Sequence, residues 1–425
     1  MTRFAVPDRT ELLPAKGTIV AGNVPVVSDQ VEVRELAVHE LPEAWQLGRI
    51  AFGMSRNDPA PTWALEARAG VTRYGAFDSA GRLIGTANDL HHEQWWAGGI
   101  LSAADVGGVA VAPEARGRGI SRALLRRVLE GGRQRGAAIS ALFPTVSAVY
   151  RSAGWASVGA MCGLDIPTSI LPQRRSGGRL SVRAGVPSDL LATGQLYTQF
   201  ARTRNGMLSR SGALFAQPGD RFPEGVDGLT VVEDGTRLVG FASWSRGVGY
   251  GADAALQVRD VVSVTAEAAR ELIGVLASWR SVVSTVRFRA LSSGAVSNEL
   301  PLESATKHRV SRWMHRPVDV VRAVTARSWP AWVRAHTTFY LHDELASWNT
   351  GTWDLQIADG RGHLEPSTRS ATLRLEIEGF ALLFSGTGCP AMVVEAGLAE
   401  TGPADDLRSL EPLMATPLPE LLDYF

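Results

Sequence analysis

One segment constrains the possible fold of this chain more than any other: an apolar run, a turn of arginine and glycine, and an amphipathic stretch. Residues 109–111 read Val-Ala-Val, which is typical of a short buried strand, and Arg116-Gly117-Arg118-Gly119 follows after Pro113. Residues 137–143 predict a second strand, so the segment predicts a βαβ unit. Its middle carries apolar residues at the spacing of one helical face, namely Ile120, Leu124, Leu125, Val128 and Leu129.

The turn of arginine and glycine is a candidate anion site. A tight strand-to-helix turn leaves backbone N–H groups unpaired at the positive end of the helix dipole, where they bind phosphate. Gly117 and Gly119 allow a close approach where a Cβ would clash, and three arginines add charged donors. The alternative is an ordinary turn with a solvated arginine cluster, and spacing alone does not separate the two. The arginines are Arg116, Arg118 and Arg122.

Tyr150 is the candidate acid. It lies in a predicted short helix that begins at Ser147, directly after the second strand, and ends at Gly154. A phenol with a pKa of about 10 is a poor acid for most oxyanions but a fair match for a thiolate leaving group. A half-buried structural tyrosine is the alternative.

Residues 107–155 resemble the core of the GNAT acetyltransferases. Residues 116–121 match the superfamily's R-x-x-G-x-(G/A) turn except at Ser121, and residues 150–155 resemble its Y-x-x-x-G-(F/Y) segment. The resemblance implies that the strand before the turn contacts the pantetheine of acetyl-CoA through Val109, Ala110 and Val111. It implies a pyrophosphate site at Gly117, Arg118, Gly119, Ile120, Ser121 and Arg122, with Thr145 and Val146 lining the co-substrate.

A faint internal repeat predicts two copies of one fold. Residues 81–85 (GRLIG) recur as residues 236–240 (TRLVG), and Val-Ala-Val at 109–111 recurs as Val-Ser-Val at 262–264. In the second copy the turn at 265–270 has no glycine and contains Glu267. We therefore expect the second copy to keep the scaffold without the phosphate site.

The pattern along the chain predicts four segments. They are a leader or arm at 1–30, a catalytic GNAT domain at 31–165, a degenerate GNAT-like domain at 166–317, and an α+β domain at 318–425. For the last we expect a helix near Pro330–Ala335 and strands at 353–358, 361–366 and 371–377.

The whole plan resembles the Eis (enhanced intracellular survival) acetyltransferases, which join an active GNAT copy, a degenerate copy and a domain like sterol carrier protein. Such enzymes acetylate amines of aminoglycosides, polyamines or lysine side chains and assemble as hexamers. In that family the terminal carboxylate is the proton acceptor, which implies Phe425 for this role. The apolar, aromatic ending at 421–425 also predicts a tail that packs.

These features predict an acetyl-CoA-dependent amine N-acetyltransferase that works by direct attack on the thioester. Tyr150 would protonate the thiolate, and the Phe425 carboxylate would accept the ammonium proton. An α-carboxyl with a pKa of about 3.3–3.7 is a weak base. Burial would raise that pKa, or a water molecule could relay the proton. One alternative is a non-catalytic acyl-CoA or lipid carrier. Another keeps the chemistry and takes lysine side chains of proteins.

The acceptor pocket has several candidate walls. Gly107-Gly108, before the pantetheine strand, suggests a wide pocket. Aromatic candidates for cation–π contact, each more readily placed in the core, are Trp45, Phe52, Trp63, Trp95 and Trp96. Acids that could attract a cation are Asp58, Asp105 and Asp423. His91 and His92 adjoin Glu93 without an evident further ligand, so we expect no metal there.

Composition excludes other classes. Lys+Arg and Asp+Glu balance at 43 each, which argues against a large nonspecific nucleic-acid surface. Two cysteines, Cys162 and Cys389, exclude a disulfide framework and a cysteine-rich zinc site. The sequence shows no signal-peptide apolar region and no apolar run of about 18 residues, so we expect a cytoplasmic protein.

Overall fold

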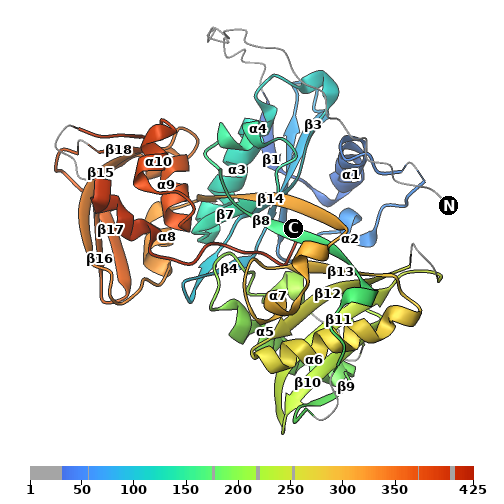
Figure 1. Cartoon of the computed structure of the whole chain (residues 1–425). Coiled ribbons are helices and arrows are strands. Elements are labelled where there is room, and N and C mark those ends of the chain that lie inside the picture. The colour runs from blue at the N-terminus through green and yellow to red at the C-terminus, as the bar shows by residue number, and fades with distance from the viewer. Residues whose placement is uncertain are drawn as a thin grey trace, which may run out of the picture.

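The computed structural model describes residues 31–55, 57–174, 178–216, 221–250, 254–371, 373–402 and 407–425. Three parts, each with strands and helices, surround the C-terminus, which lies in the middle of the molecule (Figure 1). The predicted arm at 1–30 lies outside the described residues. Within the described ranges, no helix combines the length and the apolar character that a membrane crossing requires.

The first part confirms the predicted βαβ unit. Strand β6 (Asp105–Val111), helix α3 (Ile120–Arg135) and strand β7 (Ile139–Leu142) follow one another. A four-stranded sheet has the order β1-β2-β3-β6, with β1 (Glu32–Glu35), β2 (Val71–Phe77) and β3 (Leu83–Leu90). The remaining elements are α1 (Leu41–Ala51), α2 (Thr62–Leu65), the hairpin of β4 (Glu93–Trp96) and β5 (Gly99–Ser102), and α4 (Ser147–Arg151).

Helix α3 packs on this sheet through its predicted apolar face. Ile120, Leu124, Leu125, Val128 and Leu129 are all buried. Gly85 on β3 allows the helix to come close, because a Cβ there would lie 2.8 Å from Cγ2 of Ile120 and 3.0 Å from Cδ1 of Leu124. The start of α3 is thereby held over the sheet edge that β6 forms.

A single eight-stranded sheet joins the two copies, in the order β7-β14-β8-β13-β12-β11-β10-β9. Strand β14 (Lys307–Pro317) lies between β7 and β8 (Ala156–Pro167), and both neighbours run antiparallel to it. The predicted boundaries after residues 165 and 317 fall inside β8 and at the last residue of β14, so hydrogen bonds of one sheet run across both. The other strands are β9 (Ser181–Ala184), β10 (Gly228–Asp234), β11 (Arg237–Arg246), β12 (Ala255–Ser263) and β13 (Thr285–Ala290).

The second copy repeats the packing of the first. Strands β10, β11 and β12 form an antiparallel run like β2, β3 and β6, and helix α6 (Ala266–Ala277) follows β12 as α3 follows β6. Gly240 takes the place of Gly85, since a Cβ at Gly240 would lie 3.1 Å from Leu272 and 3.2 Å from Ala268 of α6. The copy also contains α5 (Leu190–Ala201) and α7 (Ala295–Glu299).

The third part is an α+β unit with the sheet order β17-β16-β15-β18-β19. Its strands are β15 (Ala335–His342), β16 (Gly351–Ala358), β17 (Arg361–Pro366), β18 (Arg374–Glu376) and β19 (Ala399–Glu400), and its helices are α8 (Val320–Ala326), α9 (Ile377–Ser385) and α10 (Pro390–Glu395). The strands predicted at 353–358, 361–366 and 371–377 correspond to β16, β17 and β18.

The helix predicted near Pro330–Ala335 is wrong. Helix α8 lies earlier, because the Asp319 side chain accepts the Arg322 N–H at 3.1 Å and caps it. Pro330 begins only a turn, closed by the Val333 N–H to the Pro330 carbonyl at 2.9 Å, and Ala335 already belongs to β15.

Candidate active site

The site begins where β6 and β7 separate. Just before β6 the two segments run in parallel register, with Ala138 N–H bound to Ser102 O at 2.8 Å and Ala104 N–H bound to Ile139 O at 2.9 Å. Beyond this point β6 joins the four-stranded sheet and β7 the eight-stranded sheet. At the fork, the Asp105 carboxylate accepts the Ala141 N–H at 2.7 Å. Among the described strands β6 pairs with β3 alone, so its other edge faces the fork.

The turn after β6 leads into α3 through glycines in the left-handed region. Gly117 and Gly119 both have φ near +76°, and beyond their chain neighbours no atom of the described residues lies within 4 Å of where a Cβ would stand on either. Gly119 is the N-cap of α3 and supplies no side-chain cap, so the first N–H groups of α3 lack the usual side-chain acceptor within the described residues. This arrangement fits an external anion.

Helix α6 of the second copy begins differently. The Thr265 side chain caps it by accepting the Ala268 N–H at 3.1 Å, and Glu267 lies in its first turn. One N–H is therefore already paired and an acid stands nearby, which disfavours a phosphate. These contacts disfavour an anion at the start of α6, in contrast to the start of α3.

The arginines of the turn have different settings. Arg116 Nε donates to the Val111 carbonyl at 3.4 Å. Arg122 is engaged elsewhere, since it donates to Ser152 O at 2.7 Å and pairs with Glu344 at 2.8 Å. Gly117, Arg118 and Gly119 are exposed, Ser121 is half-buried, and Ile120 is buried. Pyrophosphate contact by Arg122 would require it to leave those partners.

Tyr150 is buried on α4, close to the fork. Its ring meets Trp155 edge-on, with the centroids 6.5 Å apart. Burial raises the pKa of the Tyr150 hydroxyl above its usual value, and neighbouring Tyr424 raises it further. Tyr150 therefore stays protonated at neutral pH, as an acid must before it acts. Thr145 and Val146, between β7 and α4, are exposed.

The last two residues of the chain reach the same place. The Tyr424 ring stacks on Phe143 with centroids 4.3 Å apart, and the Phe425 ring lies 5.2 Å from Phe143 and 5.4 Å from His92. Phe143 directly follows β7, and His92 lies between β3 and β4. The chain end thus contacts the first copy at the fork, which agrees with the central position of the C-terminus (Figure 1).

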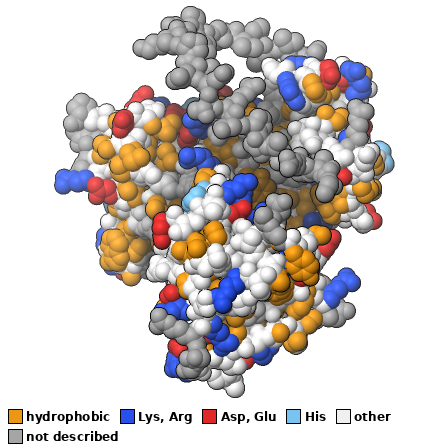
Figure 2. All heavy atoms as spheres, turned by 45° about the vertical axis from the view of Figure 1, so that its right-hand side comes forward, with side chains coloured by type: hydrophobic (Ala, Val, Ile, Leu, Met, Phe, Trp, Pro, Cys, Tyr) orange, Lys and Arg blue, Asp and Glu red, His pale blue; other side chains and the backbone are white. Residues whose placement is uncertain are grey.

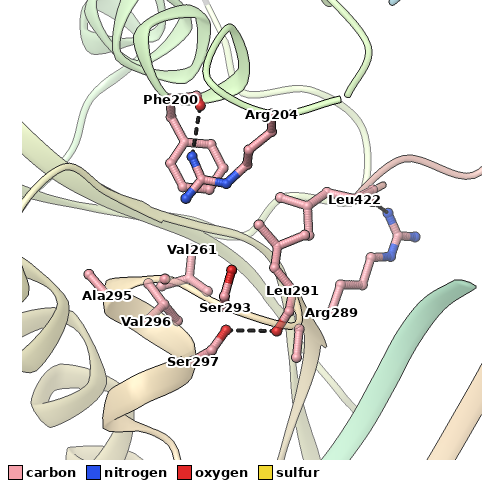
Figure 3. Close-up of a pocket in the computed structure, with 12 residues that line it drawn as sticks. Phe200, Arg204, Val261, Arg289, Leu291, Ser293, Ala295, Val296, Ser297 and Leu422 are labelled. Atoms are coloured by element: carbon pink, nitrogen blue, oxygen red, sulfur yellow. Dashed lines mark hydrogen bonds between the residues drawn. The ribbon is translucent and has the colours of Figure 1, made fainter. Parts of the chain in front are cut away.

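The second copy holds the tail that leads to this end. Asn205 donates to the Pro417 carbonyl at 2.6 Å, and its own carbonyl accepts the Glu420 N–H at 2.8 Å. Ser292 binds the Glu420 carboxylate through its N–H at 2.7 Å and its hydroxyl at 2.5 Å. Arg289 donates to the Leu422 carbonyl at 2.7 Å beside a cavity of about 20 Å³ (Figure 3).

Asp423 of the tail is bound by an arginine and a tyrosine of the second copy. Arg210 contacts its carboxylate at 3.0–3.2 Å and also pairs with Asp260 of β12 at 2.6 Å. The Tyr197 hydroxyl lies 3.3 Å from the same carboxylate. The charge of Asp423 is thus used inside the protein.

The other predicted acids do not form an anionic wall either. Asp105 is fully buried and bound to Ala141 and His92, whereas Asp58 is exposed. Burial raises the pKa of the Asp105 carboxyl, and its hydrogen bond from His92 opposes that rise. Asp105 and Asp423 are thus already paired within the protein, and Asp58 is left as the exposed acid of the three candidates.

The predicted aromatic residues divide into two groups. Trp95 and Trp96 are buried core residues, and Trp96 packs against Phe384 of the third part at 5.5 Å. Trp45 and Trp63 meet edge-on at 5.9 Å, and Trp63 is exposed. Phe52 is exposed as well.

Sequence reasoning did not single out two aromatic residues near the chain end. Phe143 stacks on Tyr424, and Phe215 lies 5.6 Å from the His92 ring, which in turn adjoins Phe425. The sequence could have indicated Phe143, because it is the last residue of the predicted strand 137–143, shortly before Tyr150. Phe215 had no local signal, since only the tertiary fold brings it to His92.

His91 and His92 point to different partners. His91 Nε2 lies 3.0 Å from the Thr72 hydroxyl, whereas His92 Nδ1 lies 3.1 Å from Asp105. Across the described ranges, no group of three His, Cys, Asp or Glu side chains is arranged to hold a metal ion.

Three family models match the chain. Residues 32–158 and 206–334 each match an acetyltransferase (GNAT) domain, and residues 320–421 match a sterol carrier protein domain. Together they cover the three parts described above.

Relatives and solved structures agree with these matches. An uncharacterized N-acetyltransferase of Streptomyces griseus is 26% identical over 373 residues, which cover 80% of this chain and 86% of the relative. A GCN5-related N-acetyltransferase from Kribbella flavida has a TM-score of 0.78 at 27% identity and covers 95% of this chain and 100% of its own. Eis1 of Mycobacterium abscessus shares the fold, with a TM-score of 0.70 at 20% identity over 93% of this chain and 100% of its own.

Proposed function

Since this chain is a GNAT-type N-acetyltransferase with two GNAT domains and a domain like sterol carrier protein, we propose that it is an Eis-type enzyme. It transfers the acetyl group of acetyl-CoA to an amine of an aminoglycoside, a polyamine or a lysine side chain. The observation that carries the proposal is the meeting of the α3 N-terminus, the fork, Tyr150 and the chain end in one region.

Acetyl-CoA fits the turn and the fork. Its pyrophosphate would take the first N–H groups of α3, where Gly117 and Gly119 leave open space. Its pantetheine would lie along the free edge of β6, at Val109, Ala110 and Val111. Thr145 and Val146 are exposed on the other side of the fork and are available to line it.

Two residues then act on protons. The carboxylate of Phe425 accepts a proton from the ammonium group of the acceptor, which makes the nitrogen a nucleophile. Tyr150 donates its phenolic proton to the departing thiolate and recovers a proton afterwards. Backbone donors of β6 orient the thioester carbonyl. The acetyl group supplied by acetyl-CoA moves to the amine in one step.

An aromatic surface suits a cationic amine. Tyr424 and Phe425 lie beside Phe143, and hydrophobic side chains gather around a hollow on the face drawn in Figure 2. Ring faces attract an ammonium group by about 0.5–2 kcal/mol. A thiol-release assay with acetyl-CoA and a panel of aminoglycosides, polyamines and lysine peptides tests the proposal; no release with any amine would refute it.

Gly119→Ala is expected to weaken acetyl-CoA binding about 10-fold or more. Gly119 has a φ of +76°, so a Cβ adds about 1–2 kcal/mol of backbone strain and occupies the space offered to phosphate. Calorimetric titration measures the loss. Gly81→Ala is the matched control, because Gly81 has a φ of +75° and equally open surroundings in the distant β2–β3 turn. If both variants bind acetyl-CoA equally well, the turn at Gly117–Gly119 does not bind its pyrophosphate.

Arg289→Met is expected to loosen the tail and reduce kcat about 3- to 10-fold. The variant loses the hydrogen bond to the Leu422 carbonyl, which contributes about 1–2 kcal/mol. Arg259→Met is the control. Within the described residues, the side chain of Arg259 donates one hydrogen bond, to the Glu224 carbonyl, which does not belong to the tail. If kcat is the same in both variants, the bond does not position the tail.

The resemblance also implies a homohexamer, which we propose for the assembly. Light scattering of the purified protein measures its mass directly. A monomer or dimer would rule the hexamer out and leave the site as described, because the residues above all belong to one chain.

A further inference from the structure

One buried pair at the fork has no part in the mechanism above: His92 and Asp105. His92 is 6% exposed and Asp105 is fully buried. The Asp105 carboxylate binds two partners, Ala141 N–H at 2.7 Å through Oδ1 and His92 Nδ1 at 3.1 Å through Oδ2. A buried histidine fixed by a carboxylate beside the chain end calls for a chemical account.

The carboxylate sets the tautomer of the ring. Asp105 accepts hydrogen bonds, so Nδ1 of His92 carries the proton and Nε2 keeps its lone pair. No described residue forms a hydrogen bond with Nε2. The ring itself lies against Phe425 at 5.4 Å and Phe215 at 5.6 Å. Nε2 is thus the remaining proton acceptor of a ring that borders the chain end.

The other charges near His92 pair with one another. Arg135 binds Asp89 at 2.8–3.0 Å, and His91 lies 3.8 Å from the same carboxylate. The His92 ring lies 5.4 Å from the ring of Phe425, the residue that carries the proposed proton acceptor. His92 is therefore bound to a buried carboxylate and adjoins the last residue of the chain.

The proposed reaction requires two proton acceptors. An ammonium group loses one proton to become a nucleophile, and the nitrogen loses a second when its bond to the acetyl carbon forms and the C–S bond breaks. Tyr150 gives one proton to the sulfur and must regain one, so one proton leaves for solvent. The Phe425 carboxylate takes the first nitrogen proton, and because the Tyr150 phenolate forms only as the C–S bond breaks, a further acceptor can take the second while the N–C bond forms.

We infer that His92 is the second proton acceptor and that Asp105 is its positioning residue. This rests on the proposed function and adds to it. The acceptor nitrogen gives one proton to the Phe425 carboxylate and the other to Nε2 of His92, directly or through one water. The resulting imidazolium is stabilised by the Asp105 carboxylate. After the products leave, one of the two accepted protons restores the Tyr150 hydroxyl and the other goes to solvent.

Two acceptors of different charge test the inference. An aliphatic diamine is charged at neutral pH and must lose two protons, whereas an acyl hydrazide is already neutral and loses one. With the diamine, His92→Gln is expected to lower kcat about 100-fold or more. With the hydrazide, the loss is expected to stay within about 5-fold, since one acceptor then suffices. The KM for acetyl-CoA stays unchanged.

Asp105→Asn provides a second, independent variant. In this variant the amide oxygen can still accept the Ala141 N–H. The amide nitrogen then takes the place of Oδ2, so Nδ1 of His92 loses the acceptor that holds its proton. The same selective loss with the diamine is expected, and the double variant should be no worse than His92→Gln alone. His91→Gln is the control, because His91 binds Thr72 and lies outside the site.

The outcomes separate the two claims. Wild-type protein without thiol release from either amine overturns the proposed function and the inference with it. An active wild type with equal losses for both acceptors, or with no loss, overturns the inference alone. If His92→Gln fails to fold, as judged by its melting curve, the diamine-to-hydrazide ratio of Asp105→Asn decides.

Discussion

Replacing Tyr150 by phenylalanine is expected to reduce kcat about 100- to 10,000-fold while acetyl-CoA binding stays within about 2-fold. The substitution removes only the hydroxyl, so the buried ring keeps its packing against Trp155. Without the phenolic proton the thiolate must leave as an anion, without the proton that lowers its energy as it departs. Steady-state thiol release and calorimetry measure the two quantities.

Tyr340→Phe is the matched control for this variant. Tyr340 lies on β15 of the third part, remote in the fold from the fork, and loses the same hydroxyl. Its kcat should equal that of the wild type. An active Tyr150→Phe enzyme would show that the proton on sulfur comes from elsewhere, and Tyr150 would then be a packing residue.

Extending the chain beyond Phe425 is expected to lower kcat about 100-fold or more, because it converts the terminal carboxylate into an amide. The tail should stay docked, since its contacts to Asn205, Ser292 and Arg210 lie before the last two residues. Melting temperature is therefore expected to change little. Two added glycines suffice, and thiol release reports the result.

The same two glycines placed at the N-terminus serve as the control. Removal of residues 424–425 is the complementary variant and should be as inactive as the extension, with acetyl-CoA binding intact. Full activity of the extended enzyme would exclude the carboxylate from the proton transfer. In that case His92 would be the acceptor to test first.

Local patterns in the sequence predicted the parts of the site that lie within one βαβ unit. The glycines of the turn, the apolar face of α3 and the helix of Tyr150 each follow from neighbouring residues, and the structure has all three elements. The weak repeat likewise predicted a second scaffold without an anion turn, and the capping Thr265 gives the physical reason.

Contacts between residues far apart in the sequence could not be predicted from local patterns. Nothing near His92 in the sequence indicates that Asp105, Phe215 and Phe425 meet it. Strand β14 is another case, since its hydrophobic pattern does not reveal that it inserts between β7 and β8. The helix expected at Pro330 failed because an apolar stretch beside a proline formed a turn and a strand.

The insertion of β14 has a consequence for how this protein is made on the ribosome. A nascent chain that has just emerged through residue 167 carries β7 and β8 without the strand that separates them. The catalytic half must wait for translation of almost the whole second copy before its sheet can close, and long-range strand pairing of this kind is slow. In the proposed mechanism the Phe425 carboxylate accepts a proton, and Phe425 is the last residue translated in this sequence, so that mechanism would become available only at the end of its synthesis.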